Sequence, residues 1–559
     1  MSVGAVAWPR EATERYTREG YWSGRPVTGA VWVWAHRCPD ATALVDGPTR
    51  LGYRELVTLA DRLADGLDRL GHGPGDTVLV QLPNCWELVV VLLGCLRRGV
   101  VPILSLPAHR AAELRSFIAL TEATAVVVPR SVRGFDHQAL GLALAEELAS
   151  VRDVLVVGEP DEVDARSVDL RAVLAGGLEV AHRGPINRGA VGLHPDGPHE
   201  FAPSGRDMAL FLLSGGTTGL PKIIPRTHDD YGYMTRRCAE LAGLDQRSVY
   251  LAALPAVHNF ALACPGILGT LSVGGRVVLA PSPEPAAAFG LIAEEGVTIT
   301  SLVPTVADRW LEAAADLRPD LSSLQVLQVG GERIPVELAL RAQAQLPATL
   351  QQTFGMAEGL VCFTRLDDQP DVVSLTQGRP ISPGDEVRVV DSDDRPVPTG
   401  QSGMLLTRGP YTFRGYYRAP EHNARAFTDD GWFRTGDLVH WHPSGNLVVD
   451  GRTKDIIIRG GEKISAQEVE ELVGALPGVA AVAAVPGPAA AVGETVCLFV
   501  VVRSGQPPVT LEGVRSALID RGVVPLKLPD RLELIDELPT TAVGKVDKPS
   551  LQRELARRG

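Results

Sequence analysis

The chain contains very little lysine. Of its 54 basic residues only six are lysine, and the remaining 48 are arginine. Because arginine supplies most of the surface charge, a lysine is expected mainly where a compact ammonium group is required. The lysines are Lys222, Lys454, Lys463, Lys527, Lys545 and Lys548. Four of them fall within the motifs described below.

The chain also lacks a net positive charge and closely spaced pairs of cysteines. The formal net charge is −13, which disfavours a nucleic-acid partner or an anionic membrane surface. The seven cysteines are scattered, and none forms a C-x-x-C pair. This pattern fits a reducing cytoplasm and no structural metal. The 45% hydrophobic and 22% charged content is typical of a globular protein in water.

Long uninterrupted apolar runs are rare. The N-terminal residues carry charge without an apolar stretch, so we expect no signal peptide. Residues 248–275 contain no Asp, Glu, Lys or Arg, but Pro255, His258 and Pro265 interrupt them. A lipid-exposed helix would tolerate that combination poorly. We therefore interpret this segment as buried chain whose polar residues face a ligand, and we expect no membrane partner.

The order of helical and strand patterns predicts an α/β fold. At 559 residues the chain is too long for a single core. Apolar strands alternating with helices predict parallel-type sheets covered on both faces. Short β runs over about 384–450 predict a β subdomain. We expect a large N-terminal domain at 1–450 and a small, mobile α+β domain at 451–559, with residues 482–493 forming a loop.

A glycine-rich loop follows the apolar run Met208–Leu212. Glycine allows positive φ and close approach of backbone N–H groups to an anion, hydroxyls add donors, and the final lysine adds positive charge. The loop is not a Walker A motif, because Pro221 precedes the lysine and no Ser or Thr follows it. It predicts a polyphosphate site formed by Ser214, Gly215, Gly216, Thr217, Thr218 and Lys222.

Five further segments carry functional residue types. Glu358 ends one of them and offers a carboxylate suited to Mg²⁺. Asp437 follows a turn and could accept hydrogen bonds from ribose hydroxyls. Each segment alone is equally consistent with an ordinary turn. The segments are Gln352–Glu358, Phe433–Asp437, Gly451–Asp455, Arg459–Lys463 and Pro539–Lys545.

Taken together and in this order, the motifs resemble the adenylate-forming superfamily of acyl-CoA synthetases, adenylation domains and luciferases. The resemblance covers essentially the whole chain. Within the superfamily, the segment from Ser214 to Tyr231, the triplet His258-Asn259-Phe260 and the segment Phe354–Leu360 are similar to aryl-acid AMP ligases. Those enzymes load salicylate or 2,3-dihydroxybenzoate in siderophore and related pathways.

The resemblance implies an ATP-dependent reaction in two steps. An aryl carboxylate attacks the α-phosphorus of ATP to give aryl-AMP and pyrophosphate, and a pantetheine thiol then takes the acyl group. The thiol belongs to a phosphopantetheinylated aryl carrier protein or, as the alternative, to free CoA. No residue decides between them. A nucleotide-binding scaffold without catalysis is a third reading, which the presence of Lys222, Glu358, Asp437 and Lys545 argues against.

The resemblance also implies residue roles. The catalytic residues would be Lys545, which bridges the carboxylate and the α-phosphate, His258, and Lys463, which is presented after the small domain swings about a hinge at Lys454. Glu358 would hold Mg²⁺. The other implied nucleotide contacts are Gly330, Gly331, Glu332, Thr353, Phe354, Gly355, Met356, Ala357, Asp437 and Arg452.

The implied acid pocket contains His258, Asn259, Phe260, Cys264, Gly331 and Val361. Asn259 can bond an ortho hydroxyl as donor or acceptor. Relatives that activate 2,3-dihydroxybenzoate carry Ser at the position of Cys264, and a thiol is a weak partner for a 3-hydroxyl. A poorly paired buried hydroxyl costs about 1–3 kcal/mol. Salicylate is therefore favoured, with 2,3-dihydroxybenzoate and a 3-hydroxyanthranilate-type acid as alternatives.

Overall fold

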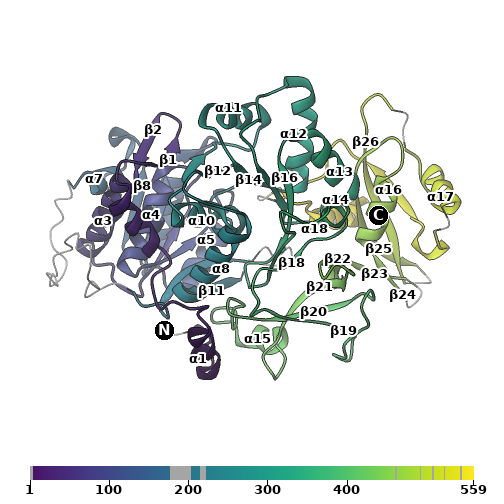
Figure 1. Ribbon diagram of the computed structural model, residues 1–559, viewed down its shortest axis with the longest axis horizontal. Coiled ribbons are helices and arrows are strands. Elements are labelled where there is room, and N and C mark those ends of the chain that lie inside the picture. The colour runs from purple at the N-terminus through teal and green to yellow at the C-terminus, as the bar shows by residue number, and fades with distance from the viewer. Residues whose placement is uncertain are drawn as a thin grey trace.

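The computed structural model describes residues 4–176, 203–214, 222–459, 462–490, 493–506, 509–521, 523–541 and 544–558. Figure 1 shows the N-terminal half of the chain on the left, a second α/β unit in the centre, a small sheet below them and the C-terminal sheet on the right. Within these residues the fold is mixed α/β, as the sequence predicts.

Two large sheets form the N-terminal part. One has the described strand order β11 (Ile223–Thr227), β10 (Met208–Leu213), β4 (Val101–Leu104), β3 (Thr77–Val80), β5 (Ala125–Pro129), β8 (Asp153–Val157), β9 (Val168–Asp169). The other has the order β18 (Arg379–Pro380), β17 (Val361–Phe363), β16 (Thr349–Gly355), β15 (Val326–Gly330), β14 (Ile299–Leu302), β12 (Val249–Ala252), β13 (Arg276–Leu279), β1 (Thr42–Asp46), β2 (Thr49–Gly52). A short hairpin, β6 (Ser131–Val132) with β7 (Phe135–Asp136), stands apart.

Helices cover these sheets. Several start where the sequence supplies a cap: the Asp136 carboxylate caps α6, and Thr227 and Asp230 form a capping box on α8. The helices are α1 (Arg10–Arg18), α2 (Gly29–Arg37), α3 (Tyr53–Arg69), α4 (Trp86–Arg98), α5 (Ala111–Thr121), α6 (His137–Glu147), α7 (Leu170–Ala175), α8 (His228–Leu241), α9 (Asn259–Ala263), α10 (Gly266–Ser272), α11 (Pro285–Glu295), α12 (Pro304–Leu317), α13 (Val336–Gln345) and α14 (Pro370–Leu375).

The two large sheets repeat one topology. In each, a hairpin and a helix precede five parallel strands, whose spatial order is β4-β3-β5-β8-β9 in the first and β13-β12-β14-β15-β16 in the second. The hairpins are exchanged, because β1 pairs with β13 and β10 pairs with β4. The first repeat (residues 42–175) and the second repeat (residues 208–355) therefore complete each other's sheets.

Two smaller sheets follow. The first contains β19 (Glu386–Val390), β20 (Gly403–Arg408), β21 (Phe433–Trp441) and β22 (Leu447–Arg452), with α15 (Pro420–Ala426) beside it. The second contains β23 (Ile456–Arg459), β24 (Glu462–Ser465), β25 (Val479–Ala490), β26 (Gly493–Val502) and β27 (Arg531–Leu534), with α16 (Ala466–Gly474), α17 (Leu511–Asp520) and α18 (Lys548–Arg558).

The prediction of a loop at residues 482–493 is wrong. Residues up to Ala490 belong to β25, which pairs with β26 over most of its length. Alternate residues, Ala483 and Val485, are fully buried beneath α18. The segment has low complexity because small side chains fit the tightly packed sheet. Pairing with β26 therefore decides its structure, although its sequence has only a weak strand pattern.

A fully buried guanidinium joins three distant segments. Arg226 on β11 has an exposed fraction of 0% and pairs with Asp230 at 2.7 Å. It also donates to the carbonyl oxygens of Ala357 at 2.8 Å and Tyr411 at 3.2 Å. A buried charge is tolerated only when it is paired and fully hydrogen-bonded, as it is here.

Within the described residues no helix is long and apolar enough to span a bilayer.

Replacing Arg226 by methionine should destabilise the fold strongly. The change leaves the Asp230 carboxylate buried without its partner, which costs about 3–5 kcal/mol. The matched control is Arg247→Met, which breaks an exposed pair with Asp245 and should change stability by less than about 0.5 kcal/mol. Urea unfolding of both variants measures the difference, and equal midpoints would contradict the role given to Arg226.

Candidate active site

The site lies where the strand order reverses in the second repeat. From β12 the chain passes to β13 on one side, and from β14 it passes to β15 on the other side. Ligands bind in the crevice at the carboxyl ends of the strands at such a switch point, which here lies between β12 and β14. The chain after β12 carries His258, and the chain after β14 carries Thr305. Gly330 and Gly331 follow at the end of β15.

A lysine from the C-terminal part of the chain reaches this crevice. Thr305 Oγ1 donates to the carbonyl oxygen of Gly544 at 3.0 Å. A Cβ atom added to Gly331, whose φ is +90°, would lie 3.2 Å from Cε of Lys545. The sequence places these residues more than 200 positions apart, and the fold brings Lys545 to the switch point.

The charges around Lys545 are mixed. Burial and the nearby Arg452 guanidinium lower the pKa of Lys545, while Glu332, Asp437 and Glu358 act in the opposite direction. The ammonium therefore lies in the field of three carboxylates from three different strands or loops. Burial, followed by the Lys545 charge, lowers the pKa of His258 to about 3. His258 is consequently neutral near pH 7, and its Nδ1 accepts the N–H of Phe260 at 3.4 Å.

Asp437 and Arg452 face each other across β21 and β22. They are register partners, and Arg452 Nε donates to Asp437 Oδ1 at 2.9 Å. The other carboxylate oxygen, Oδ2, is buried and has no hydrogen-bond partner among the described residues. A buried acceptor left unpaired is costly unless a ligand supplies the donor. This observation fits a bound group that carries hydroxyls.

Glu358 lies beside the described end of the glycine-rich loop. Tyr416 donates its hydroxyl to Glu358 Oε1 at 2.8 Å, and Lys222 Nζ lies 5.4 Å from the centre of the Tyr416 ring. Burial raises the pKa of Glu358. The sequence pattern missed Tyr416, although an aromatic residue is uncommon in this chain, at 5% of all residues. Its position indicates a link between the loop lysine and the carboxylate.

The acid-pocket residues gather at the start of α9. Tyr231 on α8 donates to Asn259 Oδ1 at 2.8 Å, and Asn259 Nδ2 donates to Cys264 Sγ at 3.5 Å. Phe260 and Cys264 are buried, with 8% and 4% exposed. Val361 is also buried and pairs in register with Gly355 on the neighbouring strand. Tyr231 was not identified from the sequence as a pocket residue, because nothing in its local pattern distinguishes it from a core tyrosine.

The remaining predicted nucleotide residues lie at the ends of β15 and β16. A Cβ on Gly330 would clash with Thr353 Oγ1 and the Thr353 backbone, so glycine is required for this close approach. Phe354, Gly355, Met356 and Ala357 continue from Thr353 toward Glu358, and Arg226 fixes this turn through the carbonyl of Ala357.

Part of the predicted set lies outside the described residues. Gly215, Gly216, Thr217 and Thr218 belong to it, and so do the side chains of Lys454 and Lys463. The two ends of the glycine-rich loop are described, since Ser214 Oγ accepts the N–H of Lys222 at 2.9 Å and Ser214 N–H reaches the Lys222 carbonyl at 2.9 Å. These bonds close the base of the loop.

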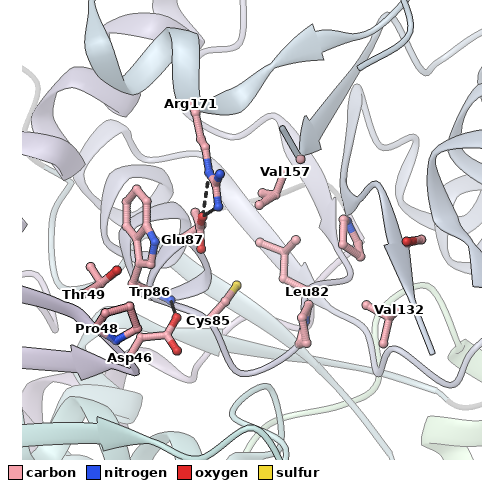
Figure 2. A pocket seen from close by; sticks show the side chains of 14 residues that line it. Asp46, Pro48, Thr49, Leu82, Cys85, Trp86, Glu87, Val132, Val157 and Arg171 are labelled. Atoms are coloured by element: carbon pink, nitrogen blue, oxygen red, sulfur yellow. Dashed lines mark hydrogen bonds and ion pairs between the residues drawn. The ribbon is translucent and has the colours of Figure 1, made fainter. Parts of the chain in front are cut away.

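The first repeat has a cavity of about 400 Å³ at its own switch point, between the ends of β3 and β5 (Figure 2). Asp46 and Trp86 line it, and Arg171 pairs with Glu87 at 2.9 Å. The corresponding hairpin connection is a short turn, and the chain has no lysine before Lys222. This cavity therefore lacks a counterpart of the glycine-rich loop and Lys222, which the sequence predicts to bind phosphate.

Comparison with known proteins identifies the family of the chain. Residues 31–417 match the family model described as AMP-binding enzyme, and residues 468–545 match its C-terminal domain. The chain belongs to the AMP-binding enzyme family. The predicted resemblance and fold class are thereby confirmed.

Individual relatives cover almost the whole chain. A salicylyl-CoA synthase / salicylate adenylyltransferase of Streptomyces sp is 55% identical, over 98% of this chain and 97% of the relative. A 2-hydroxy-7-methoxy-5-methyl-1-naphthoate–CoA ligase of Streptomyces carzinostaticus is 49% identical, over 99% and 98%. The apo structure of MbtA from Mycobacterium smegmatis matches with a TM-score of 0.73 and 43% identity, covering 99% of this chain and all of that one.

The described residues of this AMP-binding enzyme fit a nucleotide. The unpaired Asp437 Oδ2 requires a donor, and Gly331 leaves room beside Lys545 that a side chain would fill. Within the described residues no group of three His, Cys, Asp or Glu side chains could hold a metal ion. A single carboxylate such as Glu358 suits Mg²⁺ that takes its other ligands from phosphates and water.

Replacing Thr305 by valine should loosen the segment that carries Lys545. The isosteric change removes one hydrogen bond to Gly544, worth about 1 kcal/mol, which corresponds to roughly fivefold more frequent local opening. Amide hydrogen exchange over residues 539–547 measures this. Thr121→Val, which removes a buried hydroxyl bond within α5, is the control and should leave that segment unchanged. Unaltered exchange in Thr305→Val would contradict the docking contact.

Proposed function

We propose that the protein activates an aryl carboxylic acid carrying an ortho hydroxyl group, with salicylate favoured. ATP would be consumed to give aryl-AMP and pyrophosphate, and the acyl group would then pass to a pantetheine thiol. The observation that carries this proposal is the position of Lys545, which reaches the same crevice as neutral His258 and the Asp437–Arg452 pair.

Adenylation forms one bond and breaks another. A carboxylate oxygen of the acid attacks the α-phosphorus of ATP, and the bond between the α-phosphorus and the bridging oxygen to the β-phosphate breaks, releasing pyrophosphate. Negative charge builds on phosphate oxygens, so a fixed cation nearby lowers the barrier most. Lys545 would supply that cation, and Asp437 would orient the ribose. Mg²⁺ held by Glu358 would neutralise phosphate charge.

His258 fits a role as a neutral wall of the acid site. Its lowered pKa, about 3, keeps it uncharged, so it does not compete with Lys545 for the carboxylate. With Nδ1 accepting the Phe260 N–H, the ring proton is on Nε2 and is available for donation. We propose that this N–H helps to align the attacking carboxylate.

Two observations support salicylate as the favoured acid. Salicylate and the hydroxynaphthoate named for the relatives both carry a hydroxyl beside the carboxylate. Cys264 is buried and already receives the Asn259 amide, so it offers little to a 3-hydroxyl group. Salicylate therefore fits better than 2,3-dihydroxybenzoate.

For the second step we propose a swing of the domain at 451–559 about Lys454. This motion would withdraw Lys545 and present β24 with Lys463. The first family model ends at residue 417 and the second begins at residue 468. The proposed domain boundary and hinge lie between these two residues. A rigid-body swing changes which groups face the adenylate without adding new chemistry to the first step.

The acceptor thiol has two candidates. A carrier-protein pantetheine is the first, and free CoA is favoured by the names of both Streptomyces relatives, each of which mentions a CoA thioester. Incubation of the enzyme with ATP and salicylate, followed by CoA or a phosphopantetheinylated aryl carrier protein, distinguishes them by the thioester that accumulates. The scattered cysteines further support a cytoplasmic location for either reaction.

Replacing Lys545 by alanine should slow ATP–pyrophosphate exchange by roughly 10²–10³-fold, as expected for loss of a fixed charge at a developing anion. Transfer from supplied salicyl-AMP to the thiol should persist. Lys527→Ala, which removes a lysine paired with Glu468, is the control and should exchange normally. Normal exchange by Lys545→Ala would refute the proposed mechanism.

Replacing Cys264 by serine should shift preference toward 2,3-dihydroxybenzoate. The new hydroxyl can pair with a 3-hydroxyl, and recovering about 1–3 kcal/mol corresponds to a ten- to hundredfold change in relative kcat/KM. Exchange assays with both acids measure the ratio. Cys38→Ser, at the end of α2, serves as control. If Cys264→Ser keeps the original ratio, the thiol does not set this preference.

A further inference from the structure

A buried phenol controls which way the amide of Asn259 faces. Tyr231 is the fourth residue of α8, its side chain has an exposed fraction of 0%, and its hydroxyl lies 2.8 Å from Asn259 Oδ1. Arg226 holds the phenol ring in place, with its guanidinium carbon 5.0 Å from the ring centre. The Tyr231 hydroxyl is therefore a fixed partner for the first residue of α9.

Only one amide orientation satisfies every polar atom. With Oδ1 toward Tyr231, the phenol proton is donated and Nδ2 reaches Cys264 Sγ at 3.5 Å. In the flipped orientation Nδ2 would donate to the phenol oxygen, and the phenol proton would lose Asn259 Oδ1, its acceptor among the described residues. An unpaired buried donor disfavours that orientation by about ten- to a hundredfold. Burial also raises the pKa of Tyr231 well above its ordinary value, so it remains a donor.

The fixed amide presents a donor to the acid site. One of the two N–H groups on Nδ2 points to Cys264, and the second has no hydrogen-bond partner among the residues that the structure describes, so it can donate to a ligand. The Asn259 side chain is half-buried at the start of α9, next to His258. A ligand group beside this amide must therefore offer a lone pair.

Ortho-substituted benzoates differ in whether the ortho group presents a lone pair or an N–H group to the Asn259 amide. The hydroxyl of salicylate donates its proton to its own carboxylate, so its oxygen presents a lone pair outward. In 2-aminobenzoate one N–H bonds the carboxylate and the second points outward, while the nitrogen lone pair is delocalised into the ring. An outward N–H facing the Asn259 N–H places donor against donor, and a mismatched polar pair is rejected strongly in a site built for hydrogen bonding.

We propose that Tyr231 is a specificity-positioning residue, which locks Asn259 as a donor so that the site accepts an ortho oxygen and rejects an ortho amine. The proposal rests on the proposed activation of an aryl acid. It narrows the acids left open by the sequence, because a 3-hydroxyanthranilate-type acid carries the rejected group.

Tyr231→Phe tests the lock, since it removes only the hydroxyl. The wild-type enzyme should use salicylate in ATP–pyrophosphate exchange in preference to 2-aminobenzoate. In Tyr231→Phe the ratio of the two kcat/KM values should fall by about ten- to a hundredfold. The loss should appear as a higher KM for salicylate, with kcat nearly unchanged, because ground-state and transition-state binding weaken together.

Tyr233→Phe is the matched control. Tyr233 lies on the same helix, is buried, and bonds Ser382 Oγ at 2.6 Å. It contacts neither Asn259 nor Cys264 through any described hydrogen bond, so its removal should leave the acid ratio intact. A ratio that falls equally in both phenylalanine variants would point to general loosening of α8 and overturn the proposal.

A double-mutant cycle with Asn259→Ala tests whether Tyr231 acts through the amide. In that background the change of Tyr231 to Phe should have no further effect on the acid ratio. An equal fall with and without Asn259 would overturn the proposal, as would a Tyr231→Phe enzyme that discriminates like the wild type. A wild-type enzyme that exchanges with neither acid would instead refute the proposed function, and the inference with it.

Discussion

The geometry around the crevice depends on the buried ion pair between Arg226 and Asp230. This guanidinium is held at the junction of β11, α8 and the segment before Glu358. It donates to the carbonyl oxygens of Ala357 and Tyr411 and lies over the ring of Tyr231. Because an unpaired charge cannot remain in the core, these segments share one geometry. The segments proposed above to bind the metal and the acid thereby meet at one side chain.

Duplication explains where the site lies. Both repeats have a switch point, and general principles favour ligands at each. The first repeat has the cavity but a short turn in its hairpin, whereas the second has the glycine-rich connection and Lys222. The exchange of hairpins places the strands on either side of the glycine-rich connection in the sheet of the first repeat, where β10 pairs with β4. The site therefore forms between the repeats, and neither repeat alone contains all of it.

Sequence reasoning found residues that gather at the crevice and missed residues that hold them there. Lys545, Asp437 and Glu358 could be predicted because they stand in motifs whose order resembles a known family, and the structure brings them together. Tyr231, Tyr416 and Thr305 act through single hydrogen bonds to partners far along the chain. Such contacts depend on tertiary packing and leave no local pattern. The misassigned β25 has the same cause, because its pairing with β26 determined the outcome.

The described contacts around Lys545 include polar bonds, and such bonds suit the domain swing proposed above. Gly544 is held by one hydroxyl of Thr305, Arg333 pairs with Glu471 at 3.0 Å, and Ser465 donates to Asp450 O at 2.7 Å. Water can replace each of these bonds at small net cost. Polar interfaces within a chain are associated with domain motion. Meanwhile the carboxylates that attract Lys545 are opposed by Arg452 and by desolvation. In the proposed reaction, the departure of pyrophosphate would remove negative charge from the crevice, so less attraction would remain to hold the ammonium in place.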